Sequence, residues 1–136
     1  MLSNSSWAAS AMTDAATRSS WKTAGLDRPL DPVDYTDTFT DAEFAGIQRG
    51  LVPKDMDDKW FIFFEDPILY LHRSWTGNLI FTVELSAVPG GARVLHAYVV
   101  RDQDTYSRAS NEEAAKLLPW LVRGLLLRQD FPFPEL

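Results

Sequence analysis

Two histidines and one glutamate have the residue types and the spacing for proton-transfer chemistry: His72, Glu84 and His96. Each falls in a segment where apolar and polar residues alternate, which is typical of a β-strand. If residues 76–78 and 89–91 are hairpin turns, Glu84 lies opposite His96, with Cβ atoms about 4.5–5.5 Å apart. A neighbouring carboxylate raises the basicity of an imidazole. Glu84 and His96 are therefore predicted to be catalytic, with His96 as an oriented general base or a proton sensor.

Further polar and aromatic side chains share this predicted face of the sheet. The turns place Tyr70 in the row of Glu84 and His96, and a second row holds His72, Thr82 and Tyr98, with Ser74 at the margin. A polar row beside aromatic walls is the usual make-up of a small-ligand pocket. The predicted ligand-binding residues are Tyr70, His72, Arg73, Ser74, Thr82 and Tyr98. The alternative is a solvated sheet face, on which polar residues need no function.

Arg73 lies on the opposite face of its strand, which is the face predicted to be buried. An interior arginine normally has a carboxylate partner, and Glu65, Asp57 and Asp58 are the candidates. The favoured interpretation is a clamp that joins the first two strands. The alternative is an anion-binding arginine presented at the end of the sheet.

Metal and nucleophile chemistry are disfavoured. His72, His96 and Glu84 could supply three metal ligands, but a whole strand would separate the two histidines. No metal site and no cofactor are therefore predicted. Ser74 lies two residues from His72 on one strand, about 6.5–7 Å away, which is too far for a nucleophile and its base. The chain has no cysteine, so disulfides and thiolate chemistry are excluded.

Four strands are predicted to position these side chains, over residues 59–66, 68–75, 79–88 and 92–101. Asp-Pro, Thr-Gly-Asn and Pro-Gly-Gly separate them and indicate turns. One continuous apolar face results from the pairs Leu71–Val83, Leu69–Leu85, Leu95–Leu85, Ala97–Val83 and Val99–Phe81. The first strand is apolar on both faces, so the N-terminal arm, a loop or a partner must cover part of its second face.

Two helices are predicted to cover the apolar face. Thr40 and Glu43 form a capping box at the start of the first, and Gly50 is placed to end it. The second follows Ser110, and Pro119 should kink or break it. Residues 26–39 are expected to be an extended, non-helical arm. The fold class is therefore α+β, a four-stranded antiparallel meander packed by a short N-terminal helix and a kinked C-terminal helix.

Residues 1–25 are rich in Ser, Ala and Thr and are predicted to form a flexible tail, with residues 26–136 as a single domain. Trp7 and Trp21 are unusual in such a tail, and either could dock on the domain or on a neighbouring subunit.

The net charge of −6 argues against a nucleic-acid partner held by phosphate contacts. No apolar run approaches the roughly 20 residues that span a bilayer, so no membrane partner is expected. The N-terminus lacks the pattern of a secretory signal, and a bacterial cytoplasmic location is the expectation.

The motif Lys59-Trp60-Phe61-x-x-Phe64-Glu65-Asp66, followed by Leu69-Tyr70-x-His72-Arg73-Ser74-Trp75-Thr76-Gly77, resembles a family of small bacterial proteins of unassigned function. The resemblance covers the sheet and, more weakly, residues 40–58 and the last helix. Similar sequences sometimes lie beside proteins that process ADP-ribose, so the resemblance implies a nucleotide-related role. It supplies no catalytic residues.

These observations favour a cytoplasmic module that binds a small ligand or a protein partner through the polar and aromatic sheet face. The alternative is a small hydrolase or transferase in which Glu84 orients His96 as the base. A third interpretation is that the protein forms a homodimer through the apolar first strand or the tail tryptophans.

Overall fold

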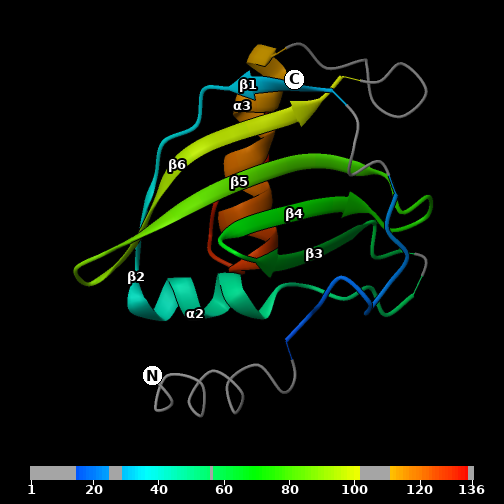
Figure 1. The fold of residues 1–136 in the computed structure, drawn as a ribbon, viewed down its shortest axis with the longest axis horizontal. Coiled ribbons are helices and arrows are strands. Elements are labelled where there is room, and N and C mark those ends of the chain that lie inside the picture. Colours follow the sequence, from blue (N-terminus) through cyan, green and yellow to red (C-terminus); the bar gives the residue numbers. More distant parts are fainter. Residues whose placement is uncertain (1–14, 25–28, 56, 102–110, 135–136) are drawn as a thin grey trace.

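A computed structural model of the chain describes residues 15–24, 29–55, 57–101 and 111–134. No helix within these ranges has the length and apolar character needed to cross a membrane. The trace in Figure 1 shows one twisted sheet with a helical segment crossing behind it.

The sheet has six strands rather than the four predicted, and every named strand pair is antiparallel. The strands are β1 (Leu30–Val33), β2 (Thr38–Thr40), β3 (Trp60–Glu65), β4 (Ile68–Arg73), β5 (Leu79–Val88) and β6 (Gly91–Val100). Their order is β1-β6-β5-β4-β3, and β2 also pairs with β6. The α+β class and the meander from β3 to β6 are confirmed, whereas the strand number is corrected.

The two additional strands come from the segment predicted to be an extended arm. Pro32 pairs with Tyr98 in β1, which is an edge strand of the sheet. Proline has no N–H to donate, so it is tolerated in a strand whose donor side faces away from the ladder. The prediction of an extended backbone was right, and its pairing with β6 was missed.

The first helix, α2 (Asp41–Arg49), begins and ends where the sequence predicts. The Glu43 amide donates to Thr40 Oγ1 at 3.1 Å, and the Thr40 amide donates to Glu43 Oε1 at 2.9 Å, which completes the capping box. Gly50 ends the helix with φ of 69°, and a Cβ there would lie 2.3 Å from the Ile62 carbonyl oxygen. Only glycine allows this close approach of the chain to β3.

The second helix changes type at Pro119, as the predicted interruption requires. An α-helix, α3 (Asn111–Pro119), leads into a π-helix, η1 (Trp120–Leu126), which the Leu127 amide closes by donating to Val122 O at 3.0 Å. Proline has no N–H to continue the α-helical pattern. The predicted cap residue Ser110 lies outside the described residues.

The helices cover one face of the sheet. The core there combines strand residues with one side of α3 and η1, whose buried members are Ala114, Leu118, Leu121, Val122 and Leu126. Figure 1 shows α3 and η1 crossing behind the strands and α2 below them in this view. Ile47 of α2 also joins this core, although the placement of the helices differs in detail from the prediction.

The second face of β3 is covered by residues 15–24, which we call the N-terminal strap. Ala16 is buried beside Phe61 and Phe63. The Ala24 amide donates to Gly77 O at 2.8 Å, and Ala24 O accepts the Leu79 amide at 2.9 Å. This part of the predicted flexible tail therefore packs on the sheet, and residues 1–14 lie outside the described ranges.

The predicted register between the second and third strands is wrong by two residues. Leu69 pairs with Val83 rather than Leu85, and Leu71 pairs with Phe81. A slip of two residues keeps each side chain on its face, so the apolar pattern cannot detect it. The pairing also shifts at His72, which lies opposite Leu79.

The predicted register between β5 and β6 is confirmed for four pairs: Phe81–Val99, Thr82–Tyr98, Val83–Ala97 and Glu84–His96. It fails beyond an irregularity at Glu84 and Leu85, because Leu85 pairs with Val94. The extra residue Leu95 is 38% exposed instead of lying in the core.

Candidate functional site

The predicted catalytic pair is aligned but not hydrogen-bonded. Glu84 lies opposite His96 in the ladder, and Ile68 rather than Tyr70 completes that row. His96 is exposed and Glu84 is half-buried. Among the described residues the structure records no hydrogen bond between their side chains, so the carboxylate does not orient the imidazole.

The corrected register places Tyr70, Thr82 and Tyr98 in one row across β4, β5 and β6. Thr82 is buried, whereas Tyr70 and Tyr98 are half-buried. The Tyr70 ring stacks on Phe63, with ring centroids 4.8 Å apart. The structure thus brings these three predicted binding residues into one row, whereas His72 lies outside the row and stacks on the same Phe63 ring as Tyr70.

His72 is buried below the strap with no exposed surface. Its ring packs against Phe61 and Phe63, and its Nδ1 lies 2.7 Å from Gly77 O. A carbonyl only accepts, so Nδ1 carries the proton and donates. Nε2 is buried without a hydrogen-bond partner in the described structure. Burial is the main cause that lowers the His72 pKa, with the charge of Arg18 adding to it and the bond to Gly77 opposing it.

Ser74 is also buried, and its hydroxyl holds the end of the sheet together. Its Oγ donates to the Asp58 carbonyl at 2.7 Å, and its amide donates to Lys59 O at 2.9 Å. The Trp21 indole of the strap donates to Ser74 O at 2.7 Å. The contacts of Ser74 are thus structural: they fix the chain before β3 and the strap to the end of β4.

Arg73 contacts the neighbouring strand through Trp60 rather than through one of the predicted carboxylates. Its guanidinium lies 5.2 Å from the Trp60 ring centroid, on the face that bears the helices. Within the described ranges it makes no ion pair, and the candidate partner Glu65 instead binds Arg18 at 2.9 Å. Arg73 is the last residue of β4, so it lies at the end of that strand.

Arg73 lines a cleft of about 390 Å³ between the edge of the sheet and the C-terminal helical segment. We call it the aromatic cleft, and its lining residues are Leu51, Asp57, Asp58, Lys59, Trp60, Arg73, Leu117, Trp120, Leu125 and Phe133. Its volume falls in the range of small-molecule sites.

Three aromatic residues from distant parts of the chain form the walls of the aromatic cleft. Trp60 is buried at the start of β3 and stacks on Phe81 at 6.2 Å. Trp120 begins η1, and its ring meets Phe133 at 4.8 Å with an interplanar angle of 80°. Two perpendicular rings form a corner in which a further planar ring can contact one by its face and the other by its edge.

The π-helix and a glycine fix Trp120 in this wall. A Cβ added at Gly124 would lie 2.7 Å from two atoms of the Trp120 ring. Part of the indole therefore lies close against the backbone of η1 at Gly124. Any larger residue at position 124 would push the ring out of its place.

The rim of the aromatic cleft carries both signs of charge. The Asp58 carboxylate accepts the Lys54 backbone amide at 2.9 Å. The Lys59 ammonium lies 5.9 Å from the Trp75 ring centroid. Arg73 is the remaining cation of the lining, and Asp57 adds a hydrogen-bond acceptor. The cleft can therefore hold an apolar ring, an acidic group and hydrogen-bond donors together.

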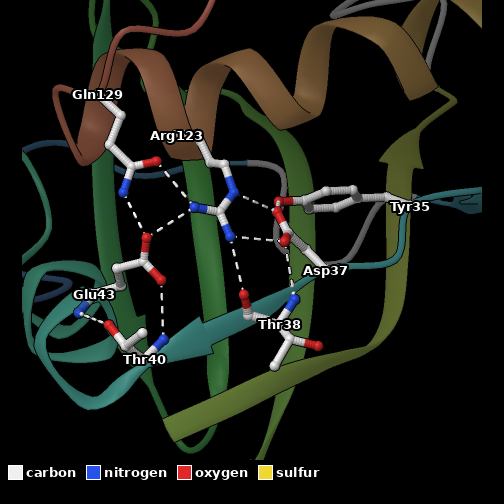
Figure 2. Close-up of polar contacts among 7 residues, drawn as sticks. All are labelled: Tyr35, Asp37, Thr38, Thr40, Glu43, Arg123 and Gln129. Carbon is white, nitrogen blue, oxygen red and sulfur yellow. Dashed lines mark hydrogen bonds and ion pairs between the residues drawn. The ribbon is translucent and has the colours of Figure 1, made fainter.

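A separate polar cluster surrounds Arg123 of η1 (Figure 2). The guanidinium binds Asp37 and Glu43, each at 2.8 Å, and donates to Gln129 Oε1 at 2.9 Å. Burial and the adjacent Asp37 raise the pKa of Tyr35, whose hydroxyl donates to that carboxylate at 2.9 Å. Hydrogen bonds from the Thr40 amide, Gln129 and Arg123 lower the Glu43 pKa to about 2.

The Arg123 cluster is structural, because its members pair one another's charges and hydrogen-bonding groups. Every charge in it has an opposite charge at hydrogen-bonding distance, and the three ionic side chains are each less than a quarter exposed. It joins η1 to the segment before β2 and to the first turn of α2. No group of three or more His, Cys, Asp or Glu placed to hold a metal ion is present in the described part of the chain.

Sequence reasoning nominated Arg73 but missed the aromatic residues around it. No local pattern could have found them, because Trp60, Trp120 and Phe133 come from distant parts of the chain. Comparisons with known proteins do not extend the assignment: no family model, no curated protein and no solved structure matches the chain.

Proposed function

We propose that the protein is a small-ligand binding module whose site is the aromatic cleft. The observation that carries the proposal is Arg73, a guanidinium without a carboxylate partner among the described residues, in a cleft walled by tryptophan and phenylalanine rings. A cationic group that none of the described carboxylates pairs with is suited to an acidic group of a ligand.

The shape of the cleft supports a planar ligand. The corner between Trp120 and Phe133 accepts a flat ring, and stacking of a base on an aromatic side chain contributes about 1–3 kcal/mol. Asp57 and Asp58 at the rim can accept hydrogen bonds from ring N–H or sugar hydroxyl groups. A planar heteroaromatic ring with an acidic substituent combines these features.

Nucleotides are the ligand class that has this chemistry. The class also agrees with the nucleotide-related role implied by the resemblance of the strand motif, and it is abundant in the cytoplasm, the location expected for the chain. The proposal moves the expected site from the face of Tyr70 and Tyr98 to the face that bears the helices, and it keeps Arg73 as the anion-binding residue.

Thermal unfolding tests the proposal, because a ligand that binds the native state raises the midpoint by mass action. The panel contains adenosine, AMP, ADP-ribose and NAD. We expect the acidic compounds to raise the unfolding midpoint in a saturable way. Arg73→Gln should abolish this rise, and Phe133→Ser should reduce it. Phe133 is 60% exposed, so its loss should leave the fold intact.

Matched controls lie on the far side of the sheet. Arg93 and Leu95 are exposed on β6, and Arg93→Gln and Leu95→Ser should leave every midpoint shift unchanged. The absence of any shift, or a shift that persists in Arg73→Gln, would contradict the proposal.

A further inference from the structure

A larger cavity, of about 530 Å³, lies beside α2 and the segment after η1. We call it the arginine cavity. It is lined by Ala42, Glu43, Gly46, Arg49, Gly50, Leu51, Val52, Leu126, Leu127, Arg128 and Gln129. It shares only Leu51 with the aromatic cleft, so its charged residues can be changed without altering that cleft.

The uncompensated charge of the arginine cavity is positive. Arg49 and Arg128 form no ion pair with any carboxylate that the structure describes. Glu43 is the acidic residue of the lining, and Arg123 and Gln129 bind its carboxylate at 2.8 and 2.6 Å. Two exposed arginines without a carboxylate partner among the described residues thus line one cavity, in a chain whose net charge is −6.

The backbone at Arg128 supports a role for its side chain. Arg128 has φ of 58°, in the left-handed region that glycine and asparagine adopt after a helix. Other residues are strained there by about 1–2 kcal/mol. Strain of this kind clusters at functional sites, where the side chain is needed.

Both arginines lie at the C-terminal end of a helix, where the dipole favours a cation. Arg49 is in the last turn of α2, and Arg128 follows Leu127, the C-cap of η1. The Gln129 amide donates to Arg123 O at 2.9 Å, so the left-handed turn at Arg128 ends η1, but glycine would form that turn without strain. Arg128 also lines an adjoining cavity of about 340 Å³, whose other charged members are Lys54 and Asp58.

We propose that Arg49 and Arg128 form a second binding site, specific for a phosphate-class dianion such as a phosphate monoester or a pyrophosphate group. Guanidinium groups bind phosphate oxygens through paired, charge-assisted hydrogen bonds. The site goes beyond the proposed function, because it requires neither the aromatic rings nor Arg73.

Calorimetric titration of the full chain with inorganic pyrophosphate tests this site. We expect saturable binding that weakens as NaCl rises from about 0.05 to 0.5 M, because salt screens exposed charges. Arg128→Gly should weaken binding about ten-fold or more, as should Arg49→Gln. Parallel titrations with ribose 5-phosphate and phosphoserine distinguish a sugar phosphate from a phosphorylated protein as the source of the group.

Arg128→Gly separates loss of the site from loss of the fold. Glycine relieves the strained backbone, so the variant should unfold at the same or a higher temperature than the parent while binding more weakly. Arg93→Gln removes an exposed arginine of β6 and should change neither property. Undetectable binding to the parent, unchanged affinity in Arg128→Gly, or equal weakening by Arg93→Gln would overturn the proposal. None of these results depends on the aromatic cleft.

Discussion

Arg123 and Asp37 form a two-pronged ion pair, in which Nε donates to Oδ2 at 2.9 Å and Nη2 donates to Oδ1 at 2.8 Å. The same guanidinium lies 4.9 Å from the Phe39 ring centroid and also binds Glu43. One side chain of the π-helix therefore joins the chain on both sides of β2 (Figure 2).

Arg123→Met should destabilise the fold, because it leaves two partly buried carboxylates without their shared cation. We expect a loss of about 2–4 kcal/mol in the free energy of unfolding. Urea denaturation at neutral pH measures it, with the exposed Arg93→Met as the matched control. A change as small as that of the control would mean that the cluster does not stabilise the fold.

His72 should make stability depend on pH. Its folded-state pKa is lowered, so the unfolded chain binds a proton more readily than the folded one. This contribution is fully present above the unfolded pKa of about 6.5 and is lost as the pH falls below it. Urea midpoints between pH 7.5 and 5 should therefore drop less in His72→Gln than in the parent.

The other histidine supplies the control for this prediction. His96 is exposed and on the same sheet, so His96→Gln should preserve the pH dependence of the parent. If His96→Gln flattens the profile and His72→Gln does not, the assignment of the buried titrating group is wrong.

Gly50 and Gly90 form a second matched pair. Both have positive φ, 69° and 84°, but an added Cβ meets the Ile62 carbonyl at 2.3 Å only at Gly50 and finds no atom within 4 Å at Gly90. Gly90→Ala should lower the free energy of unfolding by about 1–2 kcal/mol, from backbone strain alone. Gly50→Ala should lower it by at least about 1 kcal/mol more, because β3 must move. If chemical denaturation gives equal losses for the two variants, Gly50 does not lie as close to the Ile62 carbonyl as the structure shows.

The sequence predicted the elements of the fold better than their pairing. The capping box at Thr40 and the interruption at Pro119 are local effects, and both were found in the structure. The pairing of β1 and β2 with β6 depends on contacts between residues more than 50 positions apart, as for Asp31 and Val99. No local pattern encodes such contacts.

The candidate site was predicted less well for a related reason. The apolar alternation fixes the face of Tyr70, but not whether it lies beside Thr82 or Glu84, because both residues are on that face. The aromatic cleft joins the start of β3, the first residue of the π-helix and the segment near the C-terminus. Only the packing of the helical segment on the sheet reveals that these residues meet.

Nuclear magnetic resonance of the tryptophan indole N–H groups tests the proposed function most directly, with AMP titrated into the full-length, ¹⁵N-labelled protein. Trp60 and Trp120 line the aromatic cleft, whereas Trp21 and Trp75 lie elsewhere, beside Ser74. We predict saturable shifts of the Trp60 and Trp120 signals that are absent in Arg73→Gln. Signals of Trp60 and Trp120 that stay fixed, while those of Trp21 or Trp75 move, would contradict the account.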